Sequence, residues 1–130
     1  NLKEKIKELT NGVGVDVVID PVGGDYSEQA VRGTAWNGRH LVIGFANGSI
    51  PSIPLNLTLI KGISLVGVWW GRWMKTAPKE AMEDFAELIE FINNKKLLIE
   101  PSAVYSIEEA PKALQNFLDR KNLGKAVIKF

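Results

Sequence analysis

The 130 residues carry sixteen Lys and Arg against fifteen Asp and Glu, and the basic residues are spread along the chain. This balance argues against nucleic acid or an anionic membrane as a partner, and no apolar run is long enough to cross a bilayer. Cysteine is absent, which excludes disulfides, a thiolate nucleophile and Cys-based zinc sites. The composition is typical of a globular domain in a reducing compartment, and we expect a cytoplasmic protein.

The first part of the chain predicts a helix, a strand and a second helix. Apolar residues at helical spacing over residues 2–9 indicate a helix that stops at Asn11-Gly12. The almost unbroken apolar run from Val15 to Ile19 is typical of a strand buried on both faces of a parallel sheet. Asp25 is expected to cap the second helix, which should extend as far as residues 36–38.

Two further buried strands are predicted at His40 to Phe45 (HLVIGF) and at Ile63 to Trp70 (ISLVGVWW). Between them LNLTLIKG, residues 55–62, indicates a short helix or an irregular turn. Apolar strands separated by helical connections imply a parallel sheet with right-handed crossovers. The carboxyl ends of all three strands then lie on one edge, and ligands bind outside that edge.

The second part of the chain is more helical. Pro78 suits the first turn of a helix that continues to residues 93–94. Val104-Tyr105 indicates a short strand, and KAVIKF closes the chain as another. Between these strands, Ser106 and Glu109 have the spacing of a capping box. The buried face of the helix that follows this box is expected to comprise Ala110, Ala113, Leu114, Phe117 and Leu118.

Glycines mark the carboxyl ends of the three predicted strands. Gly23-Gly24 follows the first strand, Gly44 lies in the second, and Gly67 lies in the third. Without side chains, these positions let a flat ligand lie against the main chain. The alternative is that DPVGG is simply a tight turn between a strand and a helix. Two roles are also possible for Asp20: a contact with a cofactor, or hydrogen bonds to the amides of that turn.

The remaining polar and aromatic candidates favour structural roles. His40, the only histidine, begins its predicted strand and should be a partly exposed structural residue at the opposite edge. Trp69, Trp70 and Trp73 suggest packing at the end of the sheet, with Arg72 stacked on them, rather than a platform for bases. The sequence contains no triad, metal cluster or carboxylate pair. We therefore expect no catalytic residue and no metal in this chain.

Four segments together resemble a known family: VDVVIDPVGG, GRHLVIGFANGSIPSIPLN, LIKGISLVGVWWGRW and LGKAVIKF. In this order they look like the C-terminal half of a zinc-free medium-chain dehydrogenase/reductase. The branch that they resemble is the quinone oxidoreductase (zeta-crystallin-like) family, among its quinone oxidoreductase-like members. The resemblance runs through essentially the whole chain.

The resemblance implies an α/β fold, the second half of a Rossmann-type doubly wound parallel sheet. Residues 1–100 would belong to the nucleotide-binding domain, and residues 101–130 would pack toward a catalytic domain. In the family, that catalytic domain and the glycine-rich turn that holds the pyrophosphate precede the region matched here. We therefore expect the chain to be a truncated fragment.

The implied activity of the full-length protein is NADPH-dependent hydride transfer to quinones or other α,β-unsaturated carbonyls, with the isolated chain inactive. The preference for NADPH over NADH is inherited from the family. Carried onto this sequence, the cofactor contacts are Val22, Gly23, Gly24, Ile43, Gly44, Phe45, Ala46, Val68, Trp69, Trp70 and Arg120. Residues 22–24 would lie beside the ribose and diphosphate, residues 43–46 near the nicotinamide half, and residues 68–70 near the carboxamide. Arg120 is the weaker candidate, for contacting the cofactor or closing the cleft, and the favoured alternative is a solvated arginine at a helix end that complements the helix dipole.

A second possible function of the chain is to join two copies of the protein. The strand Ile63 to Trp70 should be the outer strand, and an exposed apolar edge associates unless it is paired. The resemblance implies a homodimer joined through this edge. The chain would then be a dimerisation or structural module without activity of its own. A third interpretation is a nucleotide or S-adenosylmethionine domain of another Rossmann-like family.

Overall fold

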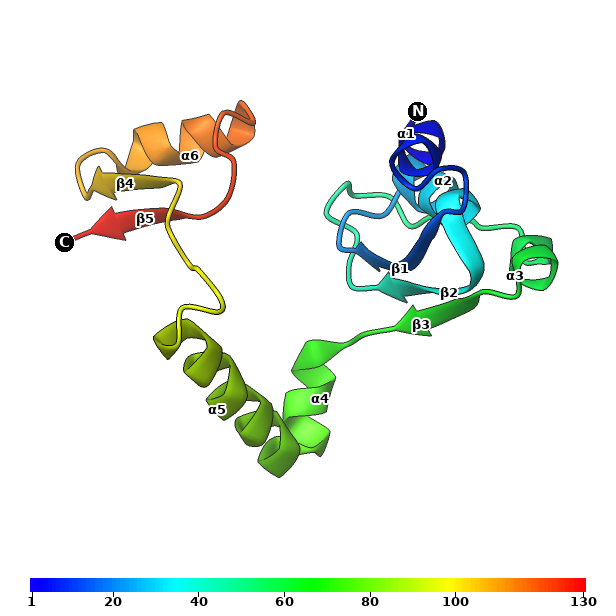
Figure 1. Cartoon of the computed structure of the whole chain (residues 1–130). Coiled ribbons are helices and arrows are strands. Elements are labelled where there is room, and N and C mark those ends of the chain that lie inside the picture. Colours follow the sequence, from blue (N-terminus) through cyan, green and yellow to red (C-terminus); the bar gives the residue numbers. More distant parts are fainter. The chain divides into compact units, whose positions relative to one another are not determined.

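The computed structural model describes all residues, 1–130, and divides into two compact units, Asn1–Thr76 and Ala77–Phe130. Each unit is described by itself. The elements of the first unit are α1 (Leu2–Leu9), β1 (Val15–Asp20), α2 (Asp25–Gly33), β2 (Thr34–Val42), α3 (Asn56–Lys61), β3 (Ser64–Gly67) and α4 (Trp70–Thr76). The elements of the second unit are α5 (Pro78–Asn93), β4 (Ala103–Ser106), α6 (Ala110–Leu118) and β5 (Ala126–Lys129) (Figure 1). The functional boundary that the sequence predicts at residue 100 stays a prediction.

The first unit is built on a parallel three-stranded sheet in the order β1-β2-β3. His40 on β2 is paired with Val18 on β1 and with Leu65 on β3. The predicted parallel sheet with helical connections is therefore confirmed. The third strand lies at one edge, as expected, and β1 lies at the other. The predicted burial is wrong for these two edge strands, because Val17 is 52% and Ile19 is 70% exposed on β1, and all four residues of β3 are exposed.

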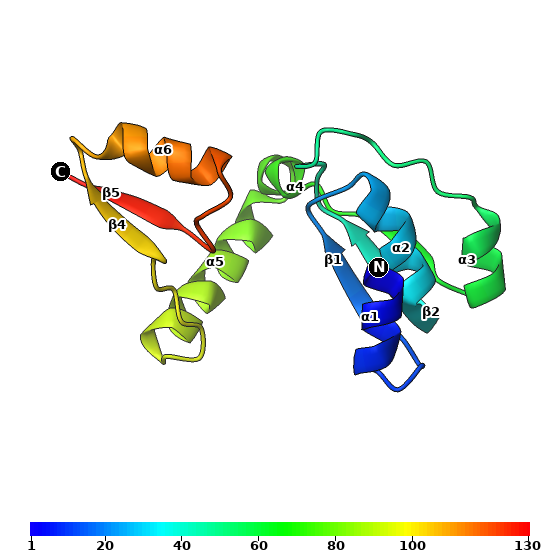
Figure 2. The same cartoon turned by 90° about the horizontal axis from the view of Figure 1, so that it is seen from above.

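Helices cover one face of this sheet. The two views place α1 and α2 side by side on the same face (Figure 1, Figure 2). Gly33 in α2 allows this close approach, because a Cβ there would lie 2.8 Å from Cδ1 of Ile6 in α1. The small buried core consists of Val31 in α2, Leu57 in α3 and Ile63 just before β3, with Ile53 packed against it. Burial of these apolar side chains holds α2, α3 and the start of β3 together.

The boundary between α2 and β2 differs from the prediction. The helix ends at Gly33, and its first residue is Asp25 itself, with Gly24 at the N-cap and no side-chain cap. Thr34 is fully buried with extended backbone, and its hydroxyl donates to the carbonyl of Ala30 at 2.9 Å. This β-branched residue begins β2 six positions before His40, the predicted first residue of the strand. The strand ends at Val42, before the predicted last residue, Phe45.

The third strand is shorter than predicted. β3 covers Ser64–Gly67, and the tryptophan-rich segment from Trp70 forms the helix α4 instead of extending the strand. The N–H groups of Arg72 and Trp73 both donate to the carbonyl of Trp69, which starts the helical turn. A short apolar run has no periodicity that separates a strand from a helix, so the sequence pattern could not reveal this change.

In the second unit, β4 and β5 form a parallel two-stranded sheet, so the predicted short strand and closing strand are confirmed. The predicted helix beginning at Pro78 is also confirmed as α5. Only half of the predicted capping box forms, with the N–H of Ser106 donating to the Glu109 carboxylate at 3.2 Å.

The predicted buried face of α6 is wrong for most of its members. Ala113 alone is buried in this helix, while Leu114 is 66% exposed and Leu118 is 78% exposed. Two strands and one short helix do not offer enough surface to cover the rest of this apolar stripe. None of the helices in either unit has both the length and the apolarity that a membrane crossing requires.

Candidate functional site

A buried polar cluster lies where β1 ends. One oxygen of Asp20, Oδ1, accepts the N–H groups of Val22 at 3.0 Å and Gly23 at 2.9 Å. Its other oxygen, Oδ2, accepts the hydroxyl of Ser27 at 2.5 Å and lies 3.1 Å from Nε2 of His40. Asp20 is 8% exposed, Ser27 1% and His40 0%. This carboxylate fastens the first residues of the DPVGG turn to both α2 and β2.

The structural role for Asp20, hydrogen bonding to the turn amides, is thus present in the structure. Burial by itself raises the pKa of Asp20, but hydrogen bonds from Gly23, Ser27, Val22 and His40 outweigh burial and hold the pKa below its ordinary value. The group is therefore an ionised acceptor at neutral pH. A carboxylate already engaged by four donors is poorly placed to exchange protons with a substrate.

The prediction for His40 is wrong. The residue lies well inside β2, which begins at Thr34, and its side chain is fully buried rather than partly exposed. Its Nε2 faces the Asp20 carboxylate, whereas Nδ1 is buried without a hydrogen-bond partner. His40 thus belongs to the packed interior between β2 and α2, where it supports Asp20.

Main-chain hydrogen bonds join the DPVGG turn to the loop that follows β2. The N–H of Ile43 donates to the carbonyl of Asp20, and that of Ala46 donates to Pro21. In the other direction, the N–H of Gly24 donates to the carbonyl of Ser49 at 3.1 Å. The two loops therefore form one backbone-linked surface along the carboxyl edge of the sheet.

The two glycines of the turn are required by this packing. Both have positive φ, 73° at Gly23 and 61° at Gly24. A Cβ on Gly23 would lie 2.8 Å from Cδ1 of Phe45, and one on Gly24 would collide with the Asn47 side chain. The space that these glycines leave open is thus filled by the neighbouring loop. This contact supports the tight-turn interpretation of DPVGG, while the cofactor role of residues 22–24 stays a prediction.

Most main-chain N–H groups at the predicted cofactor contacts already donate inside the protein. These residues are Val22, Gly23, Gly24, Ile43, Gly44, Ala46 and Val68. Phosphate oxygens need free N–H donors, as at a glycine-rich helix start. This edge therefore offers a ligand carbonyl groups and apolar surface rather than a phosphate cradle.

An apolar hollow of about 340 Å³ lies between the ends of β2 and β3. It is lined by Val42, Ile43, Gly44, Phe45, Gly67, Val68 and Trp69. Gly67 leaves it open, since no atom lies within 4 Å of where a Cβ on this residue would stand. The structure thus brings together predicted contacts from both strand ends around a space with the apolar lining that a flat ring requires.

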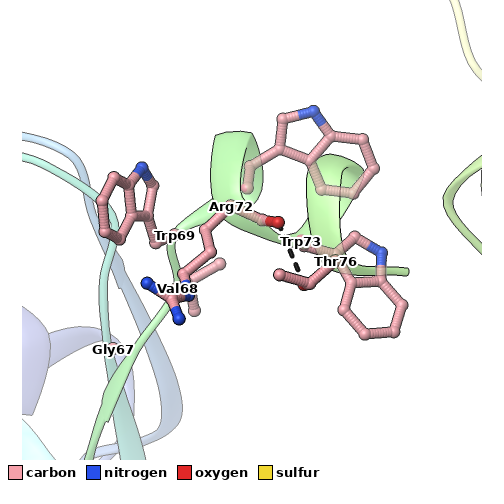
Figure 3. A pocket seen from close by; sticks show the side chains of 7 residues that line it. Gly67, Val68, Trp69, Arg72, Trp73 and Thr76 are labelled. Carbon is pink, nitrogen blue, oxygen red and sulfur yellow. Dashed lines mark hydrogen bonds between the residues drawn. The ribbon is translucent and has the colours of Figure 1, made fainter. Parts of the chain in front are cut away.

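A second hollow, of about 440 Å³, lies beyond the end of β3 (Figure 3). Its lining consists of Gly67, Val68, Trp69, Trp70, Arg72, Trp73 and Thr76. The predicted stacking of Arg72 on a tryptophan is confirmed, with its guanidinium carbon 6.0 Å from the centre of the Trp69 ring. Trp69 is 72% exposed, so these rings form an open hollow rather than a packed sheet end.

Arg120 lies in the second unit and is described apart from the other predicted contacts. It follows α6 in a left-handed conformation, with φ of 55°, and its N–H donates to the carbonyl of Phe117 at 3.0 Å. Both interpretations of this residue, cofactor contact and solvated helix-end arginine, stay open.

The side chains of this chain do not form a metal site. No three His, Cys, Asp or Glu side chains gather where they could hold an ion. The only histidine, His40, is buried against Asp20, and cysteine is absent. A zinc ion needs three or four converging N, S or O ligands. The residues of this chain do not fit a zinc ion.

Sequence reasoning missed two features of this edge. Ser27 and His40 join Asp20, and Trp73 and Thr76 join the hollow beyond β3. A polar residue inside a buried apolar strand needs a partner, and the histidine in HLVIGF was such a signal. The hollow beyond β3 gave no signal, because its walls exist only once residues 70–76 form a helix.

Comparison with known proteins agrees with this fold. A family model described as zinc-binding dehydrogenase matches residues 1–94. The quinone oxidoreductase-like protein 2 homolog of Nematostella vectensis is 41% identical over 129 residues, which are 98% of this chain and 35% of that protein. The chain thus spans little more than a third of the length of such curated relatives, 35% and 37% in two cases.

Solved structures superpose on the chain over nearly its whole length. A probable oxidoreductase from Mycobacterium abscessus has a TM-score of 0.78 at 33% identity, over 97% of this chain and 36% of that one. A mycobacterial protein solved with NADPH has a TM-score of 0.81 at 24% identity, over 98% of this chain and 38% of that one, which shows the shared fold. Because the family match covers all three strands of the first unit and α5, the chain belongs to the zinc-binding dehydrogenase family.

Proposed function

We propose that this chain supplies the second half of the NADP(H)-binding sheet in a reductase that transfers hydride to quinones or other α,β-unsaturated carbonyls. The observation that carries the proposal is the apolar hollow between the ends of β2 and β3, where Gly67 leaves room for a flat ring. The nicotinamide ring would lie here, against Phe45 and Val68. When bound, it would supply the hydride, and one further proton from water would complete the reduced acceptor.

The residues of this chain position the nicotinamide ring and shield it from water, and they do not transfer protons. Asp20 is ionised and held by four donors, so it fixes the DPVGG turn, in which Gly23 lies next to Phe45. The apolar lining excludes water from the face of the ring. Phosphate donors are expected from outside this edge, because most of its N–H groups are occupied. The isolated chain is therefore proposed to be inactive. No step is assigned to a metal, since the side chains do not fit one.

The test is an NADPH titration, followed by fluorescence, of the product of the complete reading frame and of the 130-residue chain. In the longer product, Gly67→Val should weaken NADPH binding roughly tenfold, about 1.4 kcal/mol, because it fills the hollow without meeting another atom. Ser64→Val, at the exposed opposite end of β3, is the matched control and should leave binding unchanged. Equal affinities for wild type and Gly67→Val would refute this placement of the ring.

We also propose that the chain forms a homodimer through the free edge of β3. The strand pairs only with β2, and Leu65 and Val66 are both more than one third exposed on its two faces. Unpaired apolar edges associate, and a charge on such an edge opposes association. Val66→Lys should shift sedimentation toward the monomer, whereas Val127→Lys on β5 should not. A wild-type chain that stays monomeric at high concentration would contradict this proposal. A cytoplasmic location is likewise proposed.

A further inference from the structure

The hollow beyond β3 is adjacent to the hollow proposed for the nicotinamide. The two share Gly67, Val68 and Trp69 as lining residues. Reacting groups in a hydride transfer must approach to about 3–3.5 Å. An acceptor placed in the second hollow would lie beside a ring held in the first, as this requirement demands. Its volume, about 440 Å³, lies in the range typical of small-molecule sites.

Arg72 gives this hollow a positive charge that no carboxylate balances. None of the salt bridges in the structure includes Arg72, and its described side-chain contact is with the Trp69 ring. In Figure 3 the Arg72 side chain extends back toward the end of β3, with Trp69 on one side and Trp73 on the other. An unpaired guanidinium presents its N–H donors in a planar fork that matches carboxylate or sulfonate oxygens.

The aromatic walls complement this charge. Trp69, Trp70 and Trp73 contribute indole rings, on which a flat conjugated ring stacks favourably. A purely apolar acceptor would use the rings and leave the guanidinium without a partner. An acceptor with an anionic substituent uses both features at once.

We propose that this hollow is the acceptor subsite and that it favours planar aromatic quinones or enones bearing a carboxylate or sulfonate, with Arg72 binding the anion. The inference rests on the proposed reductase function and names its substrate class. The electron balance is that of quinone reduction: NADPH gives a hydride and leaves as NADP⁺, and the quinone takes the hydride and one proton from water to become a hydroquinone. Arg72 takes no part in this transfer and acts by holding the substituent.

The experiment uses the product of the complete reading frame and two acceptors with the same ring system, 1,4-naphthoquinone and its 2-sulfonate. Arg72→Gln should raise KM for the sulfonate about tenfold and change KM for the neutral quinone less than twofold. Arg39→Gln removes another exposed arginine that has no salt bridge, on β2, and should change neither. Arg72→Lys, which keeps the charge but not the planar fork, should fall between wild type and Arg72→Gln. Equal effects of Arg72→Gln on both acceptors, or no effect on either, would overturn the proposal.

A binding measurement separates this proposal from the proposed function. Without NADPH, naphthoquinone sulfonate should quench tryptophan fluorescence of the wild type at concentrations about tenfold lower than for Arg72→Gln. If NADPH fails to bind but this difference persists, the reductase function is wrong and the anion subsite is supported. If NADPH binds and the difference is absent, the subsite is wrong and the reductase function stands.

Discussion

Replacing Asp20 by Asn tests whether the buried carboxylate holds the edge of the sheet together. The side chain accepts from Val22 and Gly23 on one oxygen and from Ser27 and His40 on the other. An amide in the same place turns one acceptor into an NH₂ donor and removes the charge that strengthens all four bonds. If the NH₂ faces Val22 and Gly23, both N–H groups lose their acceptor; if it faces the other way, the Ser27 hydroxyl and Nε2 of His40 must accept instead of donating. Each lost buried bond to a charged group costs about 1.5–3 kcal/mol. We expect the free energy of unfolding to fall by roughly 3–5 kcal/mol.

The destabilisation caused by Asp20→Asn should depend on pH. The pKa of Asp20 is lowered in the folded state, so the unfolded chain takes up this proton first as the pH falls. The contribution of the carboxylate is complete above the unfolded-state pKa, about 3.9, and is lost as the pH falls through the folded-state value. The gap between wild type and Asp20→Asn should therefore be large at pH 7 and should narrow toward pH 3.

Urea unfolding of the full chain, followed by tryptophan fluorescence, measures this gap. All four tryptophans lie between residues 36 and 73, so the signal reports the first unit. Asp16→Asn is the matched control, because Asp16 lies on the same strand and is exposed. A gap of the same size at both pH values, or a loss no larger than that of Asp16→Asn, would refute the reasoning.

Three further substitutions test packing elsewhere. Gly23→Ala should lower the free energy of unfolding by about 2 kcal/mol, since the new Cβ meets a neighbouring aromatic ring. Gly48→Ala, also at positive φ but with open space around it, should lose about half as much. Val31→Ala in the fully buried core should cost about 2 kcal/mol in the same urea assay, whereas Val13→Ala, 71% exposed, should cost almost nothing. Tyr105→Phe removes a buried hydroxyl bonded to two asparagines, and faster amide hydrogen exchange in β4 and β5 should follow; unchanged exchange rates would contradict that role.

The order of elements in the first unit follows from local patterns in the sequence. Apolar runs predict the strands β1 and β2, although not the exposure of β1, and helical spacing predicts α1 and α5. Boundaries are less certain from the sequence, because they depend on tertiary contacts. The end of α2 is fixed by burial of Thr34 and by the approach of Ile6 to Gly33. Neither contact can be read from residues 25–38 alone.

The candidate site was also predictable only in part. The carboxyl edge of a parallel sheet was predictable from the strand order, and it does bring Phe45 and Val68 to one hollow. What the glycines of DPVGG contact was not predictable, since Phe45 and Asn47 fill that space from the following loop. The hollow around Arg72 was also beyond reach, because residues 70–76 had to be recognised as a helix before their side chains could be placed around it.

The bond between Asp20 and His40 has a consequence for how the strands find each other during folding. The inner residues of β1 are apolar on both faces, so the hydrophobic pattern alone distinguishes poorly between pairings that differ by one position. A slip of one residue between β1 and β2 would turn His40 to the other face and leave Asp20 and Ser27 without it. The cluster therefore selects one alignment of the two strands, and misaligned chains would lack this source of stability.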